Sequence, residues 1–67
     1  MIMSLTYSLN VVDNTGNTIR LGLLISSRKG KTILEMQGDR HKKYFNNFRE
    51  AVIYIKKNHP EIIIDMA

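Results

Sequence analysis

The sequence predicts a small α+β protein in which an antiparallel sheet of three to four strands packs on one C-terminal helix. Two patterns carry this prediction. Apolar and polar side chains alternate over residues 3–11 and 18–26, as they do in half-buried strands, and residues 47–58 place apolar side chains at the spacing of one helical face. With 67 residues, the chain has room for a single domain, residues 1–67. Strands followed by one helix are typical of a two-layer α+β domain.

A hairpin is expected at the start of the chain. Alternate apolar residues run from Met3 to Val11, turn-forming residues follow at 13–17, and alternation resumes over 18–26. A glycine inside the second strand, Gly22, indicates a bulge or the close approach of another backbone. The two faces of the second strand are expected to be Ile19, Leu21, Leu23 and Ile25 toward the core, and Thr18, Arg20, Gly22, Leu24 and Ser26 away from it.

Two further strands are expected in the middle of the chain. A basic turn at 26–31 precedes a third strand, Thr32 to Gln37, with Leu34 and Met36 facing the core. After a turn at 38–40, residues 41–45 form a short fourth strand. Each of its faces would hold one aromatic residue, so the pattern does not decide which face is buried.

A helix is predicted from Asn47 to Asn58. Asn47 can cap the first turn, and Glu50, three residues later, completes a pair typical of helix starts. Pro60 ends the helix because it disfavours helical geometry at the residue before it. The positions expected to face the sheet are Phe48, Ala51, Val52 and Ile55, against Leu5, Leu9, Leu21, Leu23 and Leu34.

The segment after the helix, residues 61–67, is expected to form an extra C-terminal strand because it is apolar and β-branched. Such a strand can pair with a sheet edge of its own chain or with an edge of a partner. Both alternatives remain open from the sequence.

The charge distribution favours a nucleic-acid partner. The chain has ten Lys and Arg residues and six Asp and Glu residues, which gives a net charge of +4. Segment 28–43 has six basic and two acidic residues, so its own net charge is also +4. We therefore expect a basic sheet edge that contacts phosphates, of DNA in preference to RNA, with Tyr44 as one ring for stacking. The candidate contacts are Arg20, Arg28, Lys29, Lys31, Arg40, Lys42, Lys43, Tyr44, Lys56 and Lys57.

Residues 45–51, Phe-Asn-Asn-Phe-Arg-Glu-Ala, resemble the strand-to-helix join of small sheet-plus-helix DNA-binding domains. These are the arm-binding domains of tyrosine integrases and the plant ethylene-response-factor domain, where a small polar cap follows a strand that ends in Phe. The resemblance implies that the open sheet face enters the DNA major groove. This sequence has Asn47 where those families have Ser or Thr, and it lacks their bulky Arg and Trp residues on the sheet. These departures favour backbone contacts over base reading.

The alternative hypothesis is a non-enzymatic protein-interaction module, such as a homodimeric adaptor or inhibitor. The isoleucines of the tail exceed what one helix-on-sheet core needs, and a short chain gains stability from association. We expect a homodimer under either hypothesis. The richness in Ile, Asn and Lys is typical of an AT-rich genome such as that of a virus. The candidate interface residues are Leu24, Ile33, Ile62, Ile63 and Ile64.

We expect neither enzymatic activity nor a cofactor. The absence of cysteine excludes disulfides, thiolate catalysis and cysteine-ligated zinc. His41 and His59 lack a partner at the spacing of a metal site or triad, and both are expected at the surface. No apolar run approaches the roughly 18 residues of a membrane helix, and the first residues lack the features of a signal peptide. We therefore expect a cytoplasmic protein without membrane contact.

Overall fold

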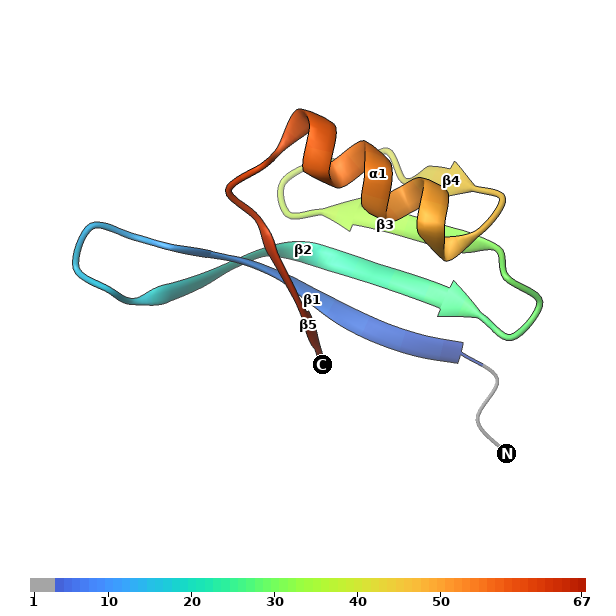
Figure 1. The fold of residues 1–67 in the computed structure, drawn as a ribbon, viewed down its shortest axis with the longest axis horizontal. Helices are drawn as coiled ribbons and strands as arrows, with labels where there is room; N and C mark the ends of the chain where they lie inside the picture. Colours follow the sequence, from blue (N-terminus) through green and yellow to red (C-terminus); the bar gives the residue numbers. More distant parts are fainter. Residues whose placement is uncertain (1–3) are drawn as a thin grey trace.

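The computed structural model describes residues 4–67. Within this range one antiparallel sheet, of strand order β4-β3-β2-β1-β5, is covered on one face by one helix, which confirms the α+β class (Figure 1). Met3, the expected first strand residue, lies outside the described range. No helix within that range is long and apolar enough to cross a membrane. The elements are β1 (Ser4–Val12), β2 (Thr18–Ser27), β3 (Thr32–Met36), β4 (Lys43–Phe45), α1 (Phe48–Asn58) and β5 (Ile63–Met66).

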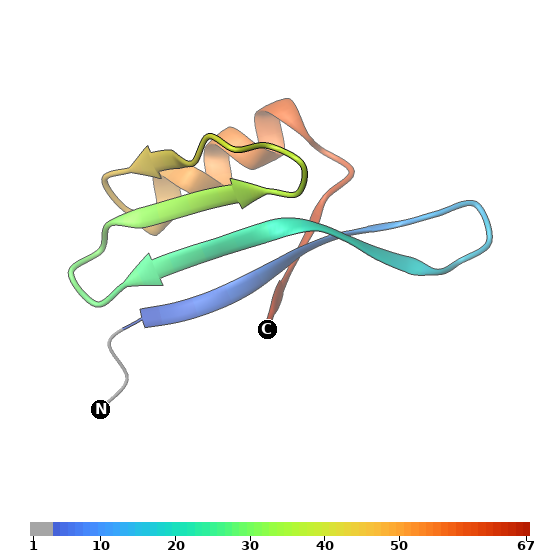
Figure 2. The same cartoon turned by 180° about the vertical axis from the view of Figure 1, so that it is seen from behind.

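The β1–β2 hairpin projects beyond the body of the molecule, as both views of the ribbon show (Figures 1 and 2). Its turn is organised by Asp13. The Oδ1 atom of Asp13 accepts hydrogen bonds from the backbone N–H groups of Thr15 and Asn17, each at 2.9 Å, and from the Thr15 hydroxyl at 2.7 Å. Gly16 supplies the positive φ of 85° that the turn requires. The predicted hairpin is therefore confirmed.

A bulge interrupts β2 where Gly22 predicted one. Leu9 of β1 faces Gly22, whereas the next residue, Asn10, faces Arg20, so Leu21 is the extra residue. A side chain at position 22 would collide with the carbonyl oxygen of Glu35 in β3. Gly22 thus marks both a bulge and a close backbone approach.

The bulge reverses the faces of β2 on its C-terminal side. Leu24 has no exposed surface and belongs to the core, so the expectation that it points outward was wrong. Leu23 and Ile25 were expected in the core, but they lie on the sheet face that the helix leaves uncovered, opposite Ser8 and Thr6 of β1. Every position from 21 to 25 except the glycine is apolar, so the alternation pattern could not show where the phase changes.

The core lies between α1 and the covered face of the sheet. The Tyr7 and Phe48 rings meet at 4.8 Å between centroids, and those of Phe45 and Tyr54 at 5.4 Å. Leu5 was expected in the core but is 46% exposed. Tyr7 contacts Phe48, the first residue of the helix, and Leu5 lies two residues nearer the start of β1, past the end of the helix. Phe48, Val52 and Leu21 are half-buried against the core. The buried apolar residues are Leu9, Leu24, Leu34, Ala51, Ile55 and Ile62.

Both ends of α1 agree with the prediction. The Asn47 side chain accepts a hydrogen bond of 2.8 Å from the backbone N–H of Glu50, and the N–H of His59 donates to the carbonyl of Ile55 at 2.7 Å. After the helix, β5 pairs antiparallel with β1 of the same chain. Of the two alternatives for the C-terminal strand, the structure therefore shows pairing with a sheet edge of its own chain.

Candidate nucleic-acid interface

The β4 strand forms one edge of the sheet and decides where the two aromatic residues of this segment point. It is shorter than the expected 41–45 and pairs Tyr44 with Ile33 and Phe45 with Thr32. Phe45 packs on the helix side against Tyr54. Tyr44 points to the uncovered face and is 71% exposed. Tyr44 is thus an exposed ring at the sheet edge.

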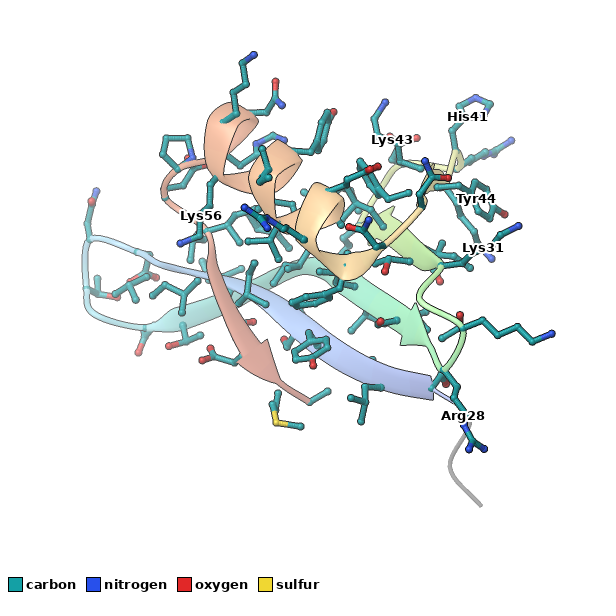
Figure 3. All side chains as sticks on the ribbon, turned by 45° about the vertical axis from the view of Figure 1, so that its right-hand side comes forward. Arg28, Lys31, His41, Lys43, Tyr44 and Lys56 are labelled. Carbon is teal, nitrogen blue, oxygen red and sulfur yellow. The ribbon has the colours of Figure 1, made fainter. Side chains whose placement is uncertain are left out.

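One basic cluster lies in the turn between β2 and β3, which contains Arg28, Lys29 and Lys31. The turn is closed by the N–H of Ser27, which donates to the Lys31 carbonyl at 2.8 Å. Lys31 directly precedes Thr32, the residue opposite the end of β4. Figure 3 accordingly shows Lys31 next to Tyr44, with Arg28 farther along the same side.

The second basic cluster, Arg40, Lys42 and Lys43, lies in the connection from β3 to β4 and in β4 itself. Its loop is held by Asp39, whose Oδ1 accepts a hydrogen bond of 2.8 Å from the backbone N–H of His41. The Lys43 ammonium lies 5.2 Å from the centroid of the Tyr54 ring, at cation–π distance. The two clusters therefore lie at opposite ends of β3, and β4 runs alongside it.

A pocket of about 180 Å³ lies where the second cluster meets the end of α1. Both histidines line it, although the sequence predicted no partnership between them. They come from a loop and a helix end, so no sequence spacing could have indicated that they line one pocket. The Nδ1 atom of His59 lies 4.0 Å from a Glu61 carboxylate oxygen. The lining residues are Leu34, Met36, Asp39, His41, Lys42, Lys43, Tyr54 and His59. Within residues 4–67 no group of three or more His, Asp or Glu side chains is placed to hold a metal ion.

Three of the sequence-predicted contacts lie away from the β4 edge. Arg20 lies on β2, next to the bulge. Lys56 and Lys57 are in the last turn of α1, and Figure 3 shows Lys56 on the other side of the molecule from Lys31 and Tyr44. The candidate contacts from Arg28 to Tyr44 therefore lie along the β4 edge, whereas Arg20, Lys56 and Lys57 do not.

The predicted interface residues divide in a similar way. Leu24 and Ile62 are buried within their own chain, and Ile64 packs against the core, so these three do not form an exposed surface. Ile63 is 47% exposed on β5. Ile33 is half-buried on the uncovered face.

The uncovered face is more apolar than the sequence predicted. Ile25 of β2 faces Ile33 of β3, which in turn faces Tyr44 of β4. We call these three residues, together with Leu23, the apolar row. The aliphatic members do not pack against the core. The row was not predicted from the sequence, because the bulge places Leu23 and Ile25 on this face and not on the expected one.

Along β1 the uncovered face is polar, with Ser4, Thr6, Ser8 and Asn10 at alternate positions. Ser8 donates a hydrogen bond of 2.8 Å to the Asn10 side-chain oxygen, and the Asn10 amide donates one of 2.9 Å to Asp65 of β5. The buried amide of Asn10 is thereby satisfied, and β5 is joined to β1 through side chains as well as through the backbone.

No protein-family model matches the chain, and no curated protein or solved structure matches it either. The resemblance at residues 45–51 to DNA-binding domains stays a prediction. The charges and contacts described above are what support a function.

Proposed function

We propose that the protein binds the phosphate backbone of a nucleic acid, DNA in preference to RNA, along the β4 edge of its sheet. The observation that supports the proposal is the placement of the two basic clusters at the two ends of β3. Between positions 28 and 43 the acidic residues are Glu35 and Asp39 alone. The edge therefore carries an excess of positive charge along its length, and a polyanion is attracted to such a surface.

The length of the edge suits several consecutive phosphates. A five-residue strand such as β3 spans roughly 17 Å at about 3.3 Å per residue. One DNA strand carries a phosphate about every 3.4 Å along the helix axis, so roughly five phosphates pass along this distance. Long Lys and Arg side chains at both ends of the strand can reach such a segment, because they are flexible and exposed.

The edge is suited to phosphates rather than to base edges. Arg20, an arginine on the sheet itself, lies apart from the edge, next to the bulge. Tyr44 is one ring, whereas proteins that bind single strands by stacking use several aromatic residues. Binding through phosphates carries no direct sequence information, so we expect similar affinity for different sequences.

A comparison of two lysine pairs tests this proposal. Lys42→Gln with Lys43→Gln removes two charges at the edge, and Lys56→Gln with Lys57→Gln removes the same charge from the last turn of α1. We expect the edge variant to flatten the plot of log affinity against log salt by about 1.4 to 1.8, the counterion release of two phosphate contacts. The helix variant should keep nearly the wild-type slope. Titrations of labelled single- and double-stranded DNA and RNA at several salt concentrations measure both.

Equal slopes for the two variants would show that binding follows net charge and not the edge. Wild-type protein without salt-dependent affinity for any of the four nucleic acids would overturn the proposal. Circular dichroism spectra of both variants should match the wild type, since all four lysines are exposed.

The alternative function, a protein-interaction module, is favoured by one specific observation, the apolar row on the uncovered face. Half-buried aliphatic side chains next to an exposed tyrosine are typical of the centre of a protein interface. The two functions are compatible, because the lysines and arginines of the edge lie at the border of that face.

A further inference from the structure

The uncovered face of the sheet holds a pocket that the proposed function does not use. The pocket lies over β2 and β3, beside the bulge, and has a volume of about 260 Å³. Its lining residues are Arg20, Gly22, Leu23, Glu35, Met36 and Gln37. Pockets for drug-sized molecules have volumes of about 300 to 1,000 Å³, so this one suits a smaller ligand.

The backbone of β2 creates this pocket. Leu21, the extra residue of the bulge, packs against the core on the other side of the sheet. Gly22 has no side chain, because the carbonyl oxygen of Glu35 leaves no room for one. Between Arg20 and Leu23, β2 therefore places no side chain on the uncovered face, and the gap is open to a ligand.

Two opposite charges line the gap. Arg20 is exposed and Glu35 is half-buried, and within residues 4–67 neither of them makes a salt bridge. The neighbours of Glu35 on this face include Leu23, its partner across the β2–β3 ladder, and Ile33, two positions away on β3. These aliphatic side chains exclude water from the carboxylate without donating a hydrogen bond to it. A partly desolvated carboxylate of this kind favours a cation beside it.

A ligand that satisfies the pocket therefore carries both charges. The guanidinium of Arg20 is suited to a carboxylate, which it can bind through two parallel hydrogen bonds, and Glu35 is suited to an ammonium group. Leu23 and Met36 offer apolar contact to the rest of the molecule. An α-amino acid holds a carboxylate and an ammonium group on one carbon atom, and it is small enough for this volume.

We propose that this pocket binds a free α-amino acid with an apolar side chain. Arg20 holds its carboxylate, Glu35 holds its ammonium group, and its side chain lies on Leu23 and Met36. The proposal does not depend on nucleic-acid binding, because none of the lining residues belongs to the two basic clusters.

A titration of isotope-labelled wild-type protein with leucine, followed by NMR, tests the ligand. We expect saturable shifts of the backbone amide signals of Gly22, Leu23 and Gln37. The dissociation constant should be about 1 mM, because two charge-assisted contacts in a pocket open to water give modest affinity. N-acetyl-leucine lacks the ammonium group and leucinamide lacks the carboxylate, so each should bind at least about tenfold more weakly. Leucine that gives no saturable shifts up to about 20 mM, or equal affinity for the three compounds, would overturn the proposal.

Two variants test which side chain holds which group. Arg20→Gln should lose the preference for leucine over leucinamide, and Glu35→Gln should lose the preference for leucine over N-acetyl-leucine. Arg49→Gln and Glu50→Gln are the matched controls, because both residues are exposed on α1, and they should keep both preferences. Preferences that persist in Arg20→Gln and Glu35→Gln would show that these side chains do not hold the ligand and would reject the assignment. All these titrations are made without nucleic acid, so they are independent of the outcome for the β4 edge.

Discussion

At the scale of single residues, Asp13 shows how one carboxylate stabilises a projecting turn. The pKa of Asp13 is lowered from its ordinary value of 3.8, first because the Thr15 hydroxyl donates to the carboxylate and then because backbone N–H groups in the turn do so. These bonds favour the charged form. The stabilisation is therefore fully present above pH 3.8 and is lost as the pH falls through the lower pKa of the folded state.

The Asp13→Asn variant tests this pH dependence. Asparagine keeps a side-chain oxygen as an acceptor but has no charge to lose. We expect the urea midpoint of the wild type to fall more steeply than that of Asp13→Asn as the pH is lowered from about 5 toward 2. Parallel decreases for the two proteins would show that the carboxylate of Asp13 contributes nothing through its charge.

At the scale of elements, α1 contributes to stability through one face. Ile55 is completely buried, whereas Ile53, two positions away on the same helix, is 56% exposed. We expect Ile55→Ala to lower the free energy of unfolding by about 2–5 kcal/mol, because it removes buried methyl groups and leaves a cavity. The matched change Ile53→Ala should cost less than about 0.5 kcal/mol. Urea denaturation of both variants measures this difference, and similar losses would show that the helix packs differently.

The same elements show how far local patterns predict this fold. The helix and its Asn47 cap depend on neighbours within a few residues, and both were predictable from the sequence. The faces of β2 were predictable only up to Leu21. After Leu21 the bulge exchanges the two faces, and it lies inside an apolar run that shows no alternation. The placement of the two basic clusters was predictable because they precede and follow one strand, β3, in the sequence. The pocket that both histidines line and the pocket beside Gly22 were not predictable, because both depend on how separate elements pack.

At the scale of the whole molecule, the basic edge and the apolar row occupy adjoining parts of one small surface. A domain of this size has a thin margin of stability, and a partner that binds only the folded state adds to it. A homodimer, which we expect from the sequence, therefore predicts a dependence of stability on protein concentration. The thermal midpoint of the wild type should therefore rise with protein concentration in calorimetry over roughly a hundredfold range. A wild-type midpoint that does not change with concentration would contradict the dimer.

The hydrogen bond between Asn10 and Asp65 has a consequence for the way in which the C-terminus finds its place. Residues 62–64 are three identical isoleucines, so a shift of β5 by one position would still offer an isoleucine to the core. A shift by one residue would, however, turn Asp65 toward the helix and leave the amide of Asn10 without its acceptor. Asp65 thus fixes the register of β5 against β1, because the isoleucines alone would allow neighbouring registers with a similar apolar contact.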